Sequence, residues 1–209
     1  MKTSYFICII LVAALAIVSW QLVKANQAKS CEESTETTDN AAYDCIMSRA
    51  SCRSFTGERL SEGQIDSLLR AGMAAPTARN QQPWQLVVIT DRDILDTIAA
   101  NQKNIKMAAE APMAIVACGD MGICGDKDDF WQQDLSAVTE NILLAANSMG
   151  LGAVWCGIYP NEERVKFVRE LLELPDSIIP LNVIPIGYPA TKLSPKEKFN
   201  QERVHYNGW

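Results

Sequence analysis

Segments with helical and with strand-like apolar spacing alternate along residues 40–187, and this order restricts the fold to a mixture of helices and strands. Three helical segments are residues 40–48, 134–149 and 161–172. A fourth begins at a capping box of Ser61 and Gln64 and runs to Met73, and a fifth is capped by Asp91. The strand-like segments are residues 85–90, 113–118, 153–159 and 182–187. Some connections are short, so we predict an α+β or mixed α/β fold.

The beginning of the 209-residue chain has the pattern of a targeting segment. Lys2 precedes an almost wholly apolar run over residues 5–23, and Val23-Lys24-Ala25 at its end is a plausible cleavage site. We therefore expect export to the periplasm or another extracytoplasmic place, with residues 1–25 removed as a signal peptide. The run is also long enough to span a bilayer, so an uncleaved membrane anchor is the alternative, and a lipid-modified Cys31 is a third.

Residues 26–40 are rich in Thr, Ser, Glu and Asn, which is typical of a solvated linker. Residues 41–209 then remain as one domain with a core of its own. The formal net charge of −6 becomes −8 without residues 1–25, because they hold two lysines and no acid. An acidic chain without a basic stripe argues against a nucleic-acid partner.

Cysteine and histidine usage excludes several kinds of active site. The chain has seven cysteines but no C-x-x-C pair, and its single histidine is His205, so we predict no metal site. Most of the cysteines are expected to be small buried residues, and a disulfide between Cys118 and Cys124 is left open. Neither a Ser-His-Asp set nor a glycine-rich phosphate loop is present, so an enzyme of this sequence would depend on an organic cofactor.

The loop sequence APTARNQQPW, residues 75–84, joins a helical segment to a strand-like one. Pro76 and Pro83 each fix one φ angle, several amide side chains lie between them, and Trp84 adds an aromatic plane. This combination suits a polar, planar ligand. A packed loop whose amides satisfy its own backbone explains the same residues equally well.

A second candidate segment is Arg49-Ala50-Ser51-Cys52-Arg53. In an extended chain, residues two apart point to the same side, so Arg49, Ser51 and Arg53 would present two guanidinium groups and a hydroxyl together. Such a set can bind a phosphate dianion. A solvated basic turn is the simpler interpretation of this motif taken alone.

Two further segments are candidates for contact with a flat ligand. Gly152 and Gly157 bracket the strand-like stretch within residues 150–160 and permit close approach of its backbone, although an ordinary buried strand has the same pattern. The sequence IPIGYP at residues 184–189 precedes the lysines of the tail, which are Lys192, Lys196 and Lys198. The alternative for this last segment is a strand end followed by a solvated tail.

Taken together and in this order, the four segments resemble the nitroreductase family, the homodimeric flavoproteins that bind FMN, over about residues 43–209. The resemblance is carried by R-x-S-x-R, the A-P-T-x-x-N-x-Q-P-W loop, a helix that ends in G-L-G, a following W-x-G strand and I-G-Y-P with basic residues. It implies a central, mostly antiparallel sheet flanked by helices, in an intertwined homodimer.

The resemblance also implies roles for individual residues. Arg49, Ser51 and Arg53 would hold the FMN phosphate and ribityl chain, and Lys198 would add a cation where relatives often carry arginine. The reactive edge of the flavin would lie along Trp155, Cys156 and Gly157. The second subunit would also contact the cofactor, through its Pro76, Thr77, Ala78 and Asn80.

The implied activity is hydride transfer from NADH or NADPH to FMN, and then reduction of a nitroaromatic, quinone or similar small acceptor by a ping-pong mechanism. A specialised flavin enzyme such as a reductive dehalogenase and a non-catalytic FMN-binding protein are the alternatives. Residues 119–132 form a long predicted loop, which makes them a candidate lid with Phe130 or Trp131 stacked on the acceptor. Packing of these aromatics in the dimer interface is the competing interpretation.

Overall fold

The computed structural model describes residue 21, residues 40–124 and residues 130–209. The chain forms two compact units, Met1–Ile46 and Met47–Trp209. Residues 40–48 are helical, as predicted. Apart from residue 21, the expected signal peptide or anchor lies outside the described residues, as does nearly all of the expected linker. None of the described helices is both long and apolar enough to cross a membrane.

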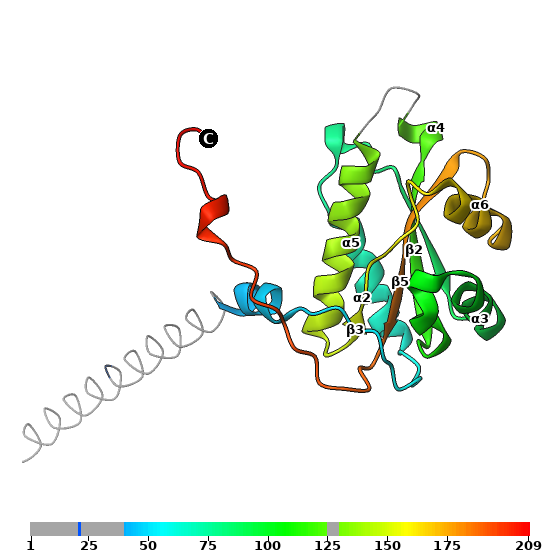
Figure 1. The fold of residues 1–209 in the computed structure, drawn as a ribbon, viewed down its shortest axis with the longest axis horizontal. Coiled ribbons are helices and arrows are strands. Elements are labelled where there is room, and N and C mark those ends of the chain that lie inside the picture. The colour runs from blue at the N-terminus through cyan, green and yellow to red at the C-terminus, as the bar shows by residue number, and fades with distance from the viewer. Residues whose placement is uncertain (1–20, 22–39, 125–129) are drawn as a thin grey trace, which may run out of the picture. The chain divides into compact units, whose positions relative to one another are not determined.

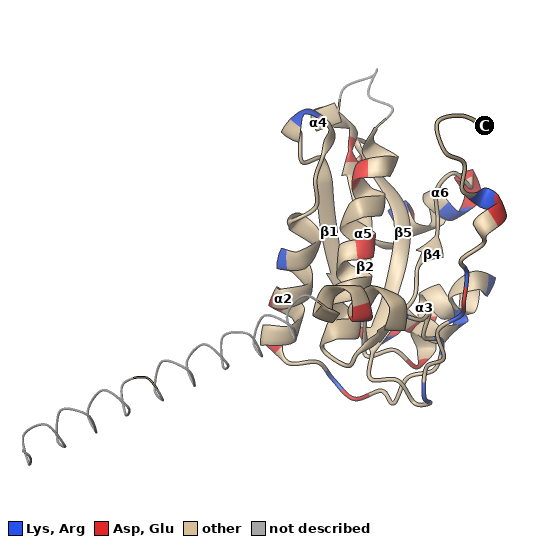
Figure 2. Cartoon of the chain, turned by 90° about the vertical axis from the view of Figure 1, so that its left-hand side faces the viewer, with Lys and Arg blue, Asp and Glu red and all other residues tan. Residues whose placement is uncertain are grey.

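The second unit contains an antiparallel sheet of five strands, in the order β1-β2-β5-β3, with β4 also paired to β5. The strands are β1 (Trp84–Ile89), β2 (Met113–Asp120), β3 (Gly152–Ala153), β4 (Cys156–Gly157) and β5 (Ile178–Gly187). The predicted antiparallel sheet flanked by helices is therefore confirmed. In Figure 2 the strands are almost free of charged residues, as expected for strands covered on both faces.

Alternate residues of the central strands enter two different cores. Val116 of β2 and Val183 of β5 are paired and belong to one apolar cluster, while Ile115 and Ile184 are paired and belong to the other. Helices α3 (Arg92–Asn101) and α6 (Glu162–Leu171), with the 3-10 turns of η2 (Lys103–Ala109), cover the first cluster. Helices α2 (Glu62–Met73) and α5 (Trp131–Ser148) cover the second, on the opposite side of the sheet (Figure 1).

Side-chain caps set the beginnings of three of these helices. Ser61 and Gln64 form the predicted capping box of α2, in which the Ser61 N–H donates to Gln64 Oε1 at 2.9 Å. Asp91 accepts from two N–H groups of α3, and Asn161 accepts from the Arg164 N–H of α6 at 3.0 Å. Gly150, just beyond α5, has a φ of +72°, as predicted for a residue that ends a helix.

Two sequence predictions differ from the structure. The strand expected over residues 153–159 is divided into β3 and β4, although Val154 and Ile158 still donate their N–H groups to β5. The long loop expected over residues 119–132 is mostly ordered secondary structure, because its first residues extend β2, Met121–Cys124 form the short helix α4, and α5 already begins at Trp131. Residues 125–129 of this loop lie outside the described residues.

We predict that Ile142→Ala lowers the free energy of unfolding by about 2–5 kcal/mol, because it leaves a cavity between α5 and α2. Ile142 is fully buried, and its side chain lies so near Gly72 that a Cβ on that glycine would be 3.0 Å from it. Urea unfolding measures the change. The matched control on the same helix is Gln133→Ala, an exposed position where we expect less than about 0.5 kcal/mol. Equal stability of the two variants would contradict this packing.

Candidate functional site

The segment of residues 49–53 lies beside β3, which brings two of the candidate segments together. Ser51 forms a parallel bridge with Ala153, and the Cys52 N–H donates to the Ala153 carbonyl at 3.0 Å. The approach requires a glycine in β3, because a Cβ at Gly152 would lie 2.5 Å from Cys52 Sγ. The two arginines of the segment are therefore anchored at the edge of the sheet that continues into residues 155–157.

The two arginines of residues 49–53 interact with a carboxylate and with buried thiols. The Arg49 Nε lies 3.2 Å from Glu140 Oε1 of α5, while Arg53 is exposed. Burial raises the pKa of the Cys156 thiol to about 11, and the positive charge of Arg53 opposes this shift. Burial likewise raises the pKa of Cys52, and Arg53 is again among the opposing charges. Arg53 is thus close enough to both thiols to place a cation beside β4.

The backbone of β4 presents polar groups away from the sheet. The neighbouring residues Val154 and Ile158 donate their N–H groups to β5, and bonded and non-bonded pairs alternate along antiparallel strands. The N–H groups of Trp155 and Gly157 therefore point away from β5. Within the described part of the chain, no heavy atom outside the chain neighbours of Gly157 lies within 4 Å of the position that its Cβ would occupy, so a flat group can approach this residue.

Asn104 and Arg164 hold the outward carbonyl of Gly157, and no sequence pattern predicts this role for either residue. Asn104 Nδ2 donates to this carbonyl at 3.1 Å and Arg164 Nη1 at 3.2 Å. Asn104 Oδ1 is buried and has no hydrogen-bond partner among the described residues. An unpartnered buried acceptor is costly, so this atom suits a ligand that brings an N–H donor. A lone asparagine in a 3-10 turn has no pattern that predicts such a role.

The loop of residues 76–82 has an unusual backbone and is fixed at the start of α5. Arg79, Asn80 and Gln82 all have positive φ angles, between 53° and 55°, and such conformations cost free energy in residues other than glycine. The Ala78 N–H donates to Asp134 Oδ1 of α5 at 2.9 Å. Some amides do satisfy the loop itself, because Gln82 Nε2 donates to Asn80 Oδ1 at 3.0 Å.

This loop and the arginine segment are attached at different positions along α5. The loop is tied to α5 at Asp134, whereas Ser48, next to Arg49, accepts from Asn147 Nδ2 near the other end of the helix. The two helix residues are thirteen positions apart, which corresponds to about 20 Å along the helix axis. The structure therefore places residues 49–53 beside Ala153 of β3, while the loop is held at Asp134, six positions along α5 from Glu140, the partner of Arg49.

The remaining predicted residues occupy different environments. Trp131 is only 5% exposed and packs edge-on against Tyr159 with ring centroids 4.9 Å apart, so its position in the core does not suit a lid. Phe130 is 42% exposed, and the Arg79 guanidinium lies 6.0 Å from its ring centroid. Lys198 is exposed, like every other residue from 194 to 209.

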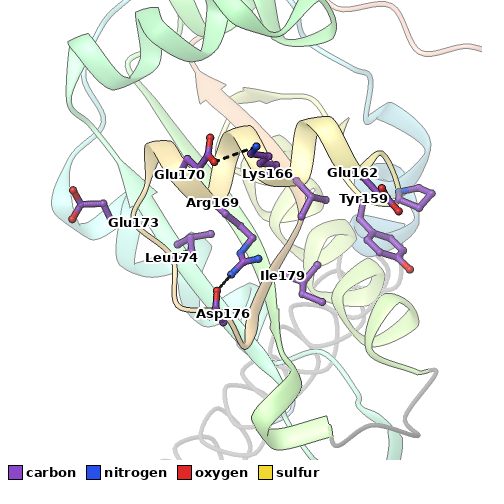
Figure 3. A pocket seen from close by; sticks show the side chains of 11 residues that line it. Tyr159, Glu162, Lys166, Arg169, Glu170, Glu173, Leu174, Asp176 and Ile179 are labelled. Carbon is purple, nitrogen blue, oxygen red and sulfur yellow. Dashed lines mark hydrogen bonds and ion pairs between the residues drawn. The ribbon is translucent and has the colours of Figure 1, made fainter.

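A separate pocket of about 800 Å³ lies between α6 and the start of β5 (Figure 3). Its basic groups are paired internally: Arg169 Nη2 lies 2.5 Å from Asp176 Oδ1, and Lys166 Nζ lies 3.8 Å from Glu170 Oε1. None of the residues predicted to bind a cofactor lines this pocket. The pocket is therefore distinct from the site at β4.

The cysteines show no sign of metal or disulfide chemistry in the part of the chain that the structure describes. Cys118 is a free thiol, so it forms no disulfide with Cys124, and both residues are buried. Burial raises the pKa of Cys118 to about 12. No group of three or more His, Cys, Asp or Glu side chains among the described residues is arranged to hold a metal ion.

Comparison with known proteins gives consistent matches. The model of the nitroreductase family matches residues 46–122 and 99–188. A protein of Archaeoglobus fulgidus, provisionally named an NADH dehydrogenase/NAD(P)H nitroreductase, is 40% identical over 167 residues, 78% of this chain and 96% of the relative. A crystal structure from Bacteroides thetaiotaomicron with the same provisional name is 46% identical, with 81% of this chain and 99% of that chain covered and a TM-score of 0.78.

A third relative has a named flavin activity. The crystal structure of the NADPH:FMN oxidoreductase of Vibrio harveyi, complexed with NAD⁺, is 28% identical to this chain. The match covers 81% of this chain and 78% of the Vibrio harveyi chain, with a TM-score of 0.69. The likeness therefore extends over most of both molecules.

We predict that Cys118 and Cys156 resist alkylation by iodoacetamide in the native protein at pH 8.5. An ordinary thiol is partly ionised at this pH, whereas pKa values of about 12 and about 11 keep these two protonated, and only the thiolate reacts. Peptide mapping by mass spectrometry measures the labelling. The same residues in urea provide the control and should react fully. Rapid labelling of either residue without urea would show that it is not buried as described.

Proposed function

The chain belongs to the nitroreductase family, and from this membership we propose that it is an FMN-dependent oxidoreductase that takes its electrons from NAD(P)H. The observation that carries the proposal is the junction of residues 49–53 with Ala153 of β3, from which the chain continues directly into residues 155–157. Similarity to the NADPH:FMN oxidoreductase of Vibrio harveyi supports the choice of both cofactors.

The side chains at this junction fit FMN, which is a phosphate dianion joined through a polyol to a planar ring. Arg49, Ser51 and Arg53 supply two guanidinium groups and a hydroxyl for the phosphate and the polyol. Asn104 Oδ1 supplies an unpartnered acceptor, and the outward N–H of Gly157 supplies a donor for the polar edge of the ring. The donor set therefore matches the hydrogen-bonding groups of FMN.

The protein residues position the cofactor and adjust its environment. FMN, when bound, supplies the redox chemistry by accepting a hydride from NAD(P)H and passing electrons to a second substrate. Arg53 places a positive charge beside β4, and the clamp of Asn104 and Arg164 fixes the carbonyl of Gly157. Because the fold holds these groups in place, they need little reorganisation when negative charge develops on the bound ring.

We further propose a nitroaromatic or a quinone as the electron acceptor, in a ping-pong sequence in which donor and acceptor use one site in turn. The open position over Gly157 supports this, because it leaves room on β4 for a flat molecule. Phe130, the exposed aromatic at the start of α5, is the remaining candidate for stacking on the acceptor. The family match supports the fold and the cofactor more strongly than the acceptor.

The active form in this proposal is a homodimer in which each FMN lies between two subunits. The different attachment points of residues 76–82 and of the arginine segment along α5 support it, because a second copy could bring its own loop to the arginine segment. Large side chains of the tail support it as well, since Phe199, Tyr206 and Trp209 are 72%, 79% and 105% exposed in the single chain. Dimerisation would then be a condition for complete cofactor binding.

Replacing Arg49 and Arg53 together with alanine is expected to raise the Kd for FMN about 100-fold or more, because two charge-assisted contacts of about 1.5–3 kcal/mol each are lost. The assay is a visible spectrum under anaerobic conditions, before and after addition of NADH or NADPH. The unmodified protein should be yellow and should bleach. The double variant should be colourless and should not respond.

Glu140→Gln is the matched control, because it removes the carboxylate 3.2 Å from Arg49 Nε and leaves both arginines in place. This variant should keep its FMN and should bleach. An unmodified protein that stays colourless with added FMN would contradict the proposed function, and one that binds FMN without bleaching would indicate a non-catalytic binding protein. Full FMN content in the double arginine variant would contradict only the phosphate assignment.

A mixture of two inactive variants tests the shared site. One subunit carries Arg49→Ala with Arg53→Ala, and the other carries Asn80→Ala. If the loop serves the partner, a mixed dimer has one site with both defects and one site with none, so about half of the normal FMN reduction per dimer should return. Each variant alone is the control. Absence of any recovery in purified mixed dimers would show that Asn80 serves its own chain.

A further inference from the structure

Arg164 is a half-buried cation at the outward edge of β4, where it and Asn104 hold the carbonyl of Gly157. It occupies the first turn of α6, where the Asn161 side chain accepts from its backbone N–H. Its Nη1 donates to the Gly157 carbonyl at 3.2 Å. The guanidinium is therefore directed at the strand from the neighbouring helix.

The charge of Arg164 is not neutralised by the described part of the chain. Across residues 40–124 and 130–209, no carboxylate oxygen lies within 4.0 Å of its guanidinium nitrogens, in contrast to Arg169 on the same helix, which pairs with Asp176 at 2.5 Å. Its partner is instead a neutral carbonyl. A cation that is held in place and is not paired remains available to a nearby anion.

We propose that Arg164 is a positioning residue that sets the reduction potential of the flavin by placing an unpaired positive charge beside its polar edge. This inference rests on the proposed function, because it needs FMN along residues 155–157. Asn104 shares the same carbonyl, and its unpartnered Oδ1 marks where the polar edge of a ring would be received. The Arg164 guanidinium and the Asn104 amide nitrogen thus donate to one backbone atom, the oxygen of Gly157.

The physical basis is the change in charge that accompanies reduction. Hydride transfer moves two electrons and one proton from NAD(P)H to the ring, so NAD(P)⁺ is formed and the ring, neutral before, carries one negative charge. A fixed cation stabilises the reduced form more than the oxidised form, especially where water is partly excluded. Charge near the ring is one of the few means by which a protein adjusts the electronics of a flavin.

Arg164→Gln tests the proposal, because it removes the charge and retains an amide donor. We expect the equilibrium constant for two-electron reduction to fall about ten-fold, which corresponds to a midpoint potential about 30 mV lower. Arg164→Lys keeps the charge and should stay within about two-fold of the unmodified protein. The potential is measured by anaerobic titration of the full chain with bound FMN against a reference dye, and FMN content is measured on the same samples.

Lys166→Gln is the matched control, because it removes one positive charge from the same helix at a side chain that is 76% exposed. It should leave the potential unchanged. An unaltered potential in Arg164→Gln with full FMN content would overturn the inference and leave the proposed function intact. Equal shifts in Arg164→Gln and Arg164→Lys would also overturn it, because the clamp and not the charge would then matter. An unmodified protein that takes up no FMN would overturn both.

Discussion

The pairing of β5 on both of its edges is the constraint on which the candidate site depends. One edge of β5 is occupied by β2 along nearly its whole length, so β3 and β4 share the other edge as short strands. Because Val154 and Ile158 are bonded to β5, the backbone groups of Gly157 between them must face outward. Asn104, Arg164 and the segment of residues 49–53 then converge on an edge that no further strand covers in the described chain.

Helix α5 determines how much of the site one chain can build. Its core face packs on the sheet and on α2, so the helix is fixed in position along its whole length. The loop of residues 76–82 is attached at Asp134 near the start of the helix, whereas Arg49 pairs with Glu140 at its middle and Ser48 with Asn147 near its end. A rigid helix keeps these attachment points apart. The fixed attachment points are compatible with the proposed completion of the site by a second copy.

The sequence predicted those parts of the fold that depend on neighbouring residues. The capping box at Ser61, the cap at Asp91 and the apolar stripes are local signals, and each lies where expected. Contacts with distant strands divide residues 153–159 into two short strands and give residues 119–124 their secondary structure. No local sequence pattern reveals such contacts. Asn104 and Arg164 were missed for the same reason, because their common partner, the Gly157 carbonyl, is contributed by another element.

Electrostatics at the site differ from those of the chain as a whole. The net charge is −6, yet Arg49, Arg53 and Arg164 all lie along one edge of the sheet. Charges farther away than about 8–10 Å are largely screened at physiological ionic strength, so these nearby cations dominate the potential that an anionic ligand meets. Arg49 is already paired with Glu140, and a phosphate would exchange one anion for another at that guanidinium. Arg53 and Arg164 have no such competitor within ion-pair distance among the described residues, so the net attraction for an anion comes from these two.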